Sequence, residues 1–88
     1  MDPYKIFVKP LPEAMKECDL HSYFSQFGLI TEVIGPIEKK GTASVRCGFI
    51  TFLETHSVRR VLEAQPLLLD ENHLIARLAR KKPLDDNG

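Results

Sequence analysis

Apolar and polar residues alternate along four short segments of this 88-residue chain. A period of two is typical of strands that bury one face, because successive side chains of a strand point to opposite sides of a sheet. The predicted strands are residues 5–9, 30–37, 44–52 and 74–79. Pro36 lies near the end of the second segment and lacks the N–H that a central strand would donate, so we expect this strand at a sheet edge.

Two further segments carry apolar residues at helical spacing. The stripe within "CDLHSYFSQFG" follows the spacing i, i+3, i+4 and i+7 and consists of Leu20, Tyr23, Phe24 and Phe27. Gly28 follows at the position of a left-handed C-terminal cap, whereas the start of this helix has no clear N-cap. In "ETHSVRRVLEAQP", Thr55 is the candidate N-cap, Pro66 ends the helix, and the apolar face consists of Val58, Val61 and Leu62.

The elements follow one another as β-α-β-β-α-β, without an internal repeat. This order predicts an α+β fold of the ferredoxin-like type, with two helices on one face of a four-stranded antiparallel sheet. The length allows a single domain over residues 1–88, with a core at about residues 4–82 and a flexible tail at 83–88. The abrupt start and the polar end favour a domain cut out of a longer protein.

Alternation also assigns each strand residue to one face of the sheet. Ile6 and Val8 are expected to point to the helices, which sends Lys5, Phe7 and Lys9 to the open face. A register shifted by one residue would exchange the faces, but it would also bury both lysines. From the last two strands, the open face would receive Val45, Cys47, Phe49, Thr51, Ile75, Arg77 and Ala79. Two phenylalanines would therefore stand on a solvent-facing sheet beside cationic side chains.

Composition narrows the class of protein but not its partner. The chain is 43% hydrophobic and 27% charged, which is typical of a soluble globular domain. Twelve acidic and twelve basic residues cancel, so only the placement of charge can indicate a nucleic acid or a membrane as partner. Acidic residues gather near the two predicted helices, whereas "RLARKK" (77–82) places four cations at the end of the last strand.

Residue types that carry catalysis or bind metals form no recognisable pattern. Two cysteines and three scattered histidines show no zinc spacing, so we expect no metal and no cofactor. Neither a phosphate-binding glycine loop nor a nucleophile–base pair is present, and we expect no enzymatic activity. The cysteine usage suits a reducing intracellular compartment, and the sequence has no signal peptide and no apolar run of membrane-helix length.

Two strand segments resemble the signature motifs of a known family. "IFVKPL" (6–11) is similar to the hexamer motif of RNA recognition motif domains, and "VRCGFITF" (45–52) is similar to their octamer motif. "DLHSYFSQFGLITEV" is similar to the family's first helix and second strand. The resemblance runs from about Lys5 to Lys82 and is strongest to the heterogeneous nuclear ribonucleoprotein and Musashi type. It implies the fold already predicted from the order of the elements.

The family stacks bases on three aromatic residues of the sheet. Carried over to this chain, the three positions are Phe7, Cys47 and Phe49, so two rings are retained and one is replaced. The resemblance implies base stacking on both rings, with weaker stacking at the nucleotide that meets the cysteine. Val45 stands where the octamer usually has a cation for a phosphate, and Arg46 stands where a glycine is usual and is expected to point to the helices.

Cations around the open face are expected to hold the phosphates and base edges of a bound strand. On the face itself they are Lys5, Lys9 and Arg77, and the loop between the second and third strands adds Lys39 and Lys40. This loop can close over a bound strand. The segment after the last strand passes over the sheet in the family, and its candidate residues here are Arg80 and Lys81.

Two side chains near the face have more than one interpretation. Cys47 is expected to be a small exposed filler, and a redox-sensitive thiol that modulates binding is the alternative. A disulfide with Cys18 is not expected, because that residue belongs to the helical side. Tyr4 either adds an aromatic ring at the sheet edge or closes the core.

The expected function is that of a single-stranded RNA-binding module, with single-stranded DNA as an alternative ligand. A second hypothesis is a domain that contacts proteins, or a second copy of itself, through its sheet or helices. It is favoured by Cys47 and Val45, which suit bases poorly, and by Ile34 and Ile75, which are expected to be exposed. We expect the isolated domain to be a monomer without membrane attachment, in the nucleus or the cytoplasm, with the nucleus favoured. The base preference stays open.

Overall fold

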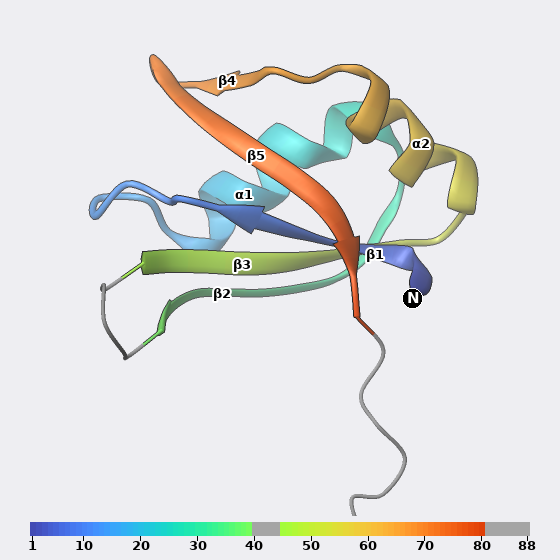
Figure 1. Cartoon of the computed structure of the whole chain (residues 1–88), viewed down its shortest axis with the longest axis horizontal. Coiled ribbons are helices and arrows are strands. Elements are labelled where there is room, and N and C mark those ends of the chain that lie inside the picture. Colours follow the sequence, from blue (N-terminus) through green and yellow to red (C-terminus); the bar gives the residue numbers. More distant parts are fainter. Residues whose placement is uncertain (40–44, 81–88) are drawn as a thin grey trace, which may run out of the picture.

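A computed structural model describes residues 1–39 and 45–80 of the chain, and these residues form one antiparallel sheet with two helices (Figure 1). The tail expected at residues 83–88 lies outside the described residues. In chain order the elements are β1 (Asp2–Lys9), α1 (Glu17–Phe24), the 3-10 turn η1 (Ser25–Phe27), β2 (Ile30–Lys39), β3 (Val45–Phe52), α2 (Thr55–Glu63), β4 (Leu67–Leu69) and β5 (Asn72–Ala79).

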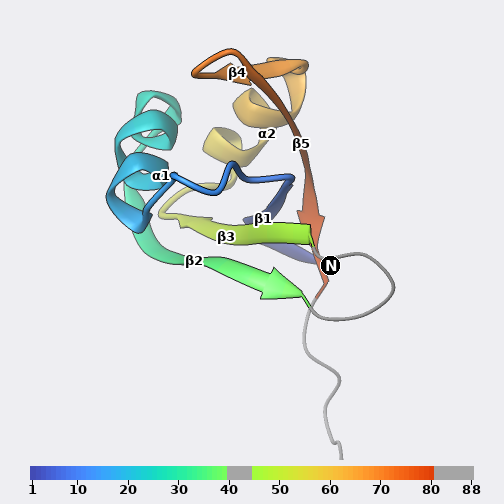
Figure 2. The ribbon, with the colours of Figure 1, turned by 90° about the vertical axis from the view of Figure 1, so that its left-hand side faces the viewer.

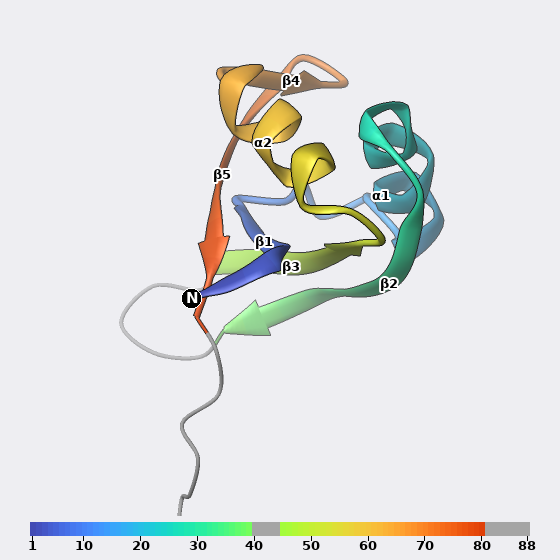
Figure 3. The same cartoon turned by 90° about the vertical axis from the view of Figure 1, so that its right-hand side faces the viewer.

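The strands lie in the order β2-β3-β1-β5-β4, and every neighbouring pair is antiparallel. Both helices cover the same face of the sheet, as Figures 2 and 3 show from opposite sides. The predicted ferredoxin-like fold is therefore confirmed, and so is the edge position of β2. In β2 the Gly35–Pro36 pair falls in an irregularity of the ladder, between the Ile34–Phe49 and Ile37–Cys47 pairs.

Two elements were not predicted from the sequence: the fifth strand, and the 3-10 turn η1, which replaces the last turn of the predicted first helix. The short β4 pairs with β5 through Leu67–Leu74 and Leu69–Asn72, and the residues between the strands, Asp70 and Glu71, both have positive φ. A two-residue loop with two positive φ angles matches the right-handed twist of a hairpin. In β4, Leu67 is buried and Leu69 packs against the core, whereas Leu68 is 53% exposed.

The core lies between the sheet and the helices, where the apolar stripes of sequence meet. β1 and β3 contribute Ile6, Val8, Ile50 and Phe52, the helices contribute Leu20, Phe24, Val58 and Val61, and all eight are at most 2% exposed. Full burial of an aliphatic or aromatic side chain of this size stabilises a fold by roughly 1.5–3 kcal/mol. The helix-side assignment made from alternation is thus correct for β1 and β3.

The starts of two helices and of one strand were not predicted correctly from the sequence. α1 begins at Glu17 because the carboxylate of Asp19 accepts a hydrogen bond of 2.8 Å from the N–H of Lys16, a signal that sequence reasoning missed. Thr55 is not an N-cap, since it is already the first residue of α2 and Glu54 holds the cap position. β1 begins at Asp2, and Tyr4 is 45% exposed, which excludes the interpretation that it closes the core.

Gly28 is required by a close approach as well as by its backbone. Its φ of 153° is strained for a residue with a side chain, and a Cβ at this position would overlap Oγ of Ser57 in α2. The left-handed cap of α1 expected at Gly28 is not formed, since Gly28 follows η1 and has a ψ of −179°. Gly28 instead allows α2 to lie against the turn that leads from η1 into β2.

Gln65 joins the end of α2 to β5 with two hydrogen bonds. Its Nε2 donates to the carbonyl oxygen of Ala76, and its Oε1 accepts from the N–H of Ala76, each at 2.9 Å. The side-chain amide thus satisfies both backbone groups of a residue that is 3% exposed. β4 begins two residues after Gln65, and its first residue, Leu67, pairs with Leu74 of β5. The Gln65 amide therefore extends the pairing with the β5 backbone from Leu74 to Ala76.

The substitution Gln65→Ala should lower the free energy of unfolding by about 2 kcal/mol, because it leaves two buried backbone groups of Ala76 without partners. Urea denaturation followed by circular dichroism measures this change. Gln26→Ala is the matched control: it removes one exposed hydrogen bond to Tyr23 and should change stability by no more than about 0.5 kcal/mol. Equal stability of the two variants would contradict the structural role of Gln65.

Candidate nucleic-acid interface

A row of four residues crosses the face of the sheet that the helices leave open. In the ladder register, Ile34 of β2 pairs with Phe49 of β3, Phe49 pairs with Phe7 of β1, and Phe7 pairs with Arg77 of β5. The centroids of the two rings are 5.2 Å apart, with an angle of 53° between the planes. The two phenylalanines of the predicted motifs are therefore direct neighbours on the face to which alternation assigned them.

A second row on this face contains Cys47, at the position where the motif resemblance implies a third ring. Ile37 pairs with Cys47, and Lys9 pairs with Ile75. Ile75 is 58% exposed and Ile37 is 38% exposed, whereas Ile34, expected to be exposed, is half-buried. The open face thus divides into a row with both rings and Arg77 and a second row beside it. Ile37, Cys47 and Ile75 of the second row are called the apolar row below, and Lys9 lies among them.

Three residues on this face are more deeply buried than the sequence predicts. Phe7, Cys47 and Ala79 are 7%, 1% and 1% exposed and form a small cluster of their own, against which Phe49 packs. All three residues lie on the predicted face of the sheet, but the expected exposure of their side chains is wrong. Alternation identifies the side of a sheet but not the height of neighbouring side chains, and two short side chains lie below the level of the rings and long cations around them.

Two cations of this face lie over the two rings. The guanidinium carbon of Arg77 is 5.0 Å from the centroid of Phe7, and Nζ of Lys5 is 5.9 Å from the centroid of Phe49. Such cation–π contacts stabilise an exposed site by roughly 0.5–1 kcal/mol. Each ring that the sequence assigned to base stacking therefore already has a cationic neighbour from the same chain.

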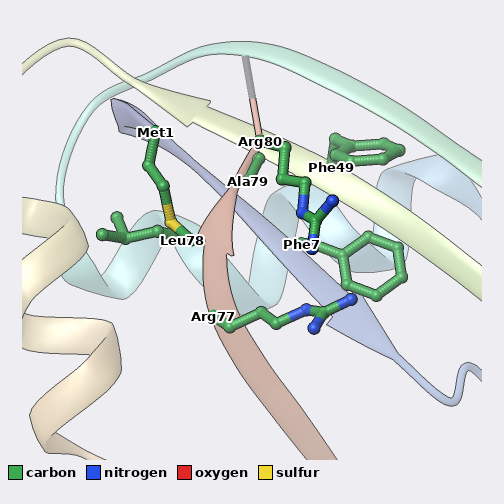
Figure 4. A pocket seen from close by; sticks show the side chains of 7 residues that line it. All are labelled: Met1, Phe7, Phe49, Arg77, Leu78, Ala79 and Arg80. Atoms are coloured by element: carbon green, nitrogen blue, oxygen red, sulfur yellow. The ribbon is translucent and has the colours of Figure 1, made fainter. Parts of the chain in front are cut away.

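A hollow of about 220 Å³ opens next to the rings (Figure 4). It is lined by Met1, Phe7, Phe49, Arg77, Leu78, Ala79 and Arg80. In Figure 4 the side chains of Arg77 and Arg80 extend toward Phe7 from β5 and from the residue that follows it. Rings and short apolar side chains with cations beside them suit a flat ligand that carries negative charge.

The cations of the face are free of acidic partners within residues 1–39 and 45–80. In that part of the chain the one contact of this kind joins Nε2 of the His56 imidazole to Oε1 of Glu54, at 3.2 Å, at the start of α2. Lys5 and Lys9 are half-buried, and Arg77 and Arg80 are exposed. The backbone of Lys39 pairs with Val45, while its side chain, and all of Lys40 and Lys81, lie outside what the structure describes.

Arg46 belongs to the framework of the domain. Its Nη2 donates a hydrogen bond of 3.3 Å to the carbonyl oxygen of Met15, just before α1, and its own carbonyl oxygen accepts one from the N–H of Leu11. The side chain therefore points to the helix side, as alternation predicted. It ties β3 to the segment between β1 and α1 instead of serving the open face.

Sequence reasoning missed two residues of the hollow. Met1 reaches it because β1 starts at Asp2, three residues earlier than the alternating segment indicated. Leu78 packs against the core but also lines the hollow and is half-buried. No pattern in the sequence separates these roles, because both depend on where the ends of β1 and β5 meet.

Two other kinds of site find no support among the described residues. No group of three or more histidine, cysteine, aspartate or glutamate side chains there could hold a metal ion. No helix within the same residues is long and apolar enough to cross a membrane.

The chain matches the family model of the RNA recognition motif over residues 6–72. It therefore belongs to the RNA recognition motif family, which confirms the resemblance seen in its hexamer and octamer motifs and the interpretation that it is not an enzyme. Over 85 residues it is 29% identical to heterogeneous nuclear ribonucleoprotein 27C of Drosophila melanogaster, an alignment that covers 97% of this chain and 20% of that protein.

Solved structures share the fold. The RNA-binding domain of Hrp1 in complex with RNA aligns with a TM-score of 0.75 and 25% identity, over 90% of this chain and 47% of that one. The SXL-lethal protein/RNA complex aligns with a TM-score of 0.75 and 18% identity, over 92% of this chain and 49% of that one. The chain spans about a fifth of the length of the curated relatives that it matches first.

The burial of Cys47 predicts a difference in reactivity between the two cysteines. Cys18 is exposed and should react with a thiol reagent within minutes in the native protein, while Cys47 should react on the order of 100-fold more slowly, because the sheet must open first. The variant Cys18→Ser isolates the second thiol, and denaturant should remove the protection. Fast labelling of Cys47 in the native variant would instead support the redox-sensitive thiol.

Proposed function

We propose that the open face of this domain binds single-stranded RNA, with bases stacked on Phe7 and Phe49. The observation that carries the proposal is the adjacency of the two rings, 5.2 Å apart, beside a hollow with two arginines in its lining. Stacking of a base on an aromatic ring contributes roughly 1–3 kcal/mol and suits any base. The relatives support RNA as the ligand, since the matching structures of Hrp1 and the SXL-lethal protein are complexes with RNA.

Phosphates are held in this proposal by cations on and around the face. Lys5, Lys9, Arg77 and Arg80 come from β1, β5 and the residue after β5, and none forms an ion pair with an acidic residue in the described part of the chain. Lys39, Lys40 and Lys81 complete the predicted set. Cys47 offers no ring, so one nucleotide of the bound strand stacks less well than on the other two positions.

The wider role follows from the relatives in the same way. We propose a module that acts as a monomer within a longer RNA-binding protein of the ribonucleoprotein kind, in the nucleus or the cytoplasm. Single-stranded DNA presents the same bases and phosphates, and comparison of RNA and DNA oligomers of equal sequence separates the two ligands.

A second candidate function is contact with a protein through the apolar row. The specific observation is the exposure of Ile75 and Ile37 on the open face. If this row binds a protein and the aromatic row binds RNA, Ile37→Thr and Ile75→Thr should leave RNA binding unchanged. Loss of RNA binding in these variants would assign the apolar row to the nucleic acid.

The double substitution Phe7→Leu and Phe49→Leu should weaken binding of a random-sequence RNA octamer by roughly 10- to 100-fold, because it keeps apolar volume but removes both stacking surfaces. Fluorescence anisotropy of a labelled octamer measures the change. Leucine is chosen because Phe7 is buried in the small cluster and truncation to alanine would also destabilise the fold.

The matched control for this experiment is Leu29→Ala, which truncates an apolar side chain that is 73% exposed and precedes β2. It should bind the octamer like the wild type. Unchanged binding in the double leucine variant, with its unfolding transition intact, would refute stacking on this face.

Salt dependence reports the phosphate contacts separately from stacking. The double variant Lys5→Ala, Lys9→Ala should reduce the slope of log affinity against log salt by about 1.4, on the basis of about 0.7 per phosphate contact for single strands. The control Arg59→Ala, Arg60→Ala removes two exposed cations of α2, and its slope should equal that of the wild type. Equal slopes in both double variants would show that Lys5 and Lys9 do not contact phosphates.

A further inference from the structure

Phe7 is the ring of the open face that is covered most. It is 7% exposed although it lies on the side of the sheet that the helices leave open. Arg77, its cross-strand neighbour on β5, places its guanidinium carbon 5.0 Å from the ring centroid (Figure 4). A flat ligand that stacks on this part of the ring must occupy space that Arg77 holds.

The contact can be exchanged without disturbing the fold. Arg77 is exposed, and no acidic residue of the described chain forms an ion pair with it. Its strand is anchored on the other face by Leu74 and Ala76, which are 1% and 3% exposed. The side chain can therefore leave the ring while β5 stays in place.

Once it has left the ring of Phe7, the guanidinium group of Arg77 can bind a phosphate at the same site. Arg80 lines the same hollow, so a strand whose base enters it brings its phosphates near two arginines. Guanidinium groups bind phosphates through paired N–H donors, and they do so more strongly than they interact with a neutral ring. Departure from Phe7 and capture of a phosphate thus favour each other.

We propose that, in the free domain, the side chain of Arg77 occupies the position on Phe7 where a base would stack. A bound base displaces this side chain, and its guanidinium group then binds a phosphate of the RNA. This inference rests on the proposed function and specifies how its central ring becomes available. It makes Arg77 a residue with two opposed effects: it lowers affinity by covering the ring and raises affinity by holding the phosphate. The second effect is screened by salt, whereas the first is less so, because the contact is partly desolvated.

The position of Arg77 can be observed directly by nuclear magnetic resonance. Protons of its side chain that lie over Phe7 should show an upfield ring-current shift in the free protein, and the shift should disappear when a random-sequence RNA octamer saturates the domain. Phe7→Leu should abolish the shift in the free protein. A shift that persists at saturation would overturn the proposal, because the base would then stack without displacing Arg77.

Binding of the octamer to Arg77→Ala over a range of salt tests the two opposed effects. The variant should bind more weakly than the wild type at 50 mM salt and more tightly at 500 mM, with its relative affinity rising about fivefold over this range. Arg59→Ala on α2 is the matched control and should follow the wild type throughout. Weaker binding of Arg77→Ala at every salt concentration would overturn the proposal and leave Arg77 as a simple contact.

Failure of the two proposals is distinguishable. If no RNA octamer binds the wild type at 50 mM salt, the proposed function fails, whatever ring-current shift the free protein shows. Suppose instead that the octamer binds and that binding requires Phe7 and Phe49. If the ring-current shift then persists at saturation, or if Arg77→Ala does not change from the weaker to the tighter binder as salt rises, the displacement of Arg77 is refuted and the proposed function stands.

Discussion

The pairing of β1 with β3 is the constraint on which the rest of the molecule depends. One register sets Ile6 opposite Ile50 under the helices and, one residue further, Phe7 opposite Phe49 on the other face. Because the side-chain period of a strand is two, a slip by one residue would exchange the core face with the open face. The same hydrogen-bonded ladder therefore stabilises the fold and aligns the two rings. Stability and the candidate function are not separable in this pair of strands.

Side chains on the open face of the sheet are less exposed to solvent than the alternation of residues predicts. Phe7, Cys47 and Ala79 form a small buried cluster, and cations from β1 and β5 lie over the two rings. An aromatic face left bare would be an exposed apolar patch, which favours association of copies. Covering by the chain's own cations limits this exposure in the free domain. Because these cations already contact the rings, a ligand must replace existing contacts. The area of the rings alone therefore overstates the free energy gained on binding.

Cys47 marks how this domain differs from the family pattern that its motifs resemble. It fills the position of a third ring with a side chain that is buried to 99% and flanked in the ladder by Ile37. The result is an apolar row where the family carries a stacking surface. The domain therefore combines an aromatic row with the apolar row beside it, and residues of β1, β2, β3 and β5 all contribute to this division.

The sequence by itself determined the order of elements, the edge position of β2, the faces of β1 and β3, and the two rings that stand together, because these follow from periodicity and from local motifs. Only the tertiary structure decided the depth of Cys47 and Ala79, the pairing of β4 with β5, the hollow that includes Met1, and the place of Arg77 over Phe7. The reason is physical: alternation fixes the direction of a side chain relative to its own strand. Exposure, in contrast, depends on the lengths and conformations of neighbours from strands that are distant in sequence.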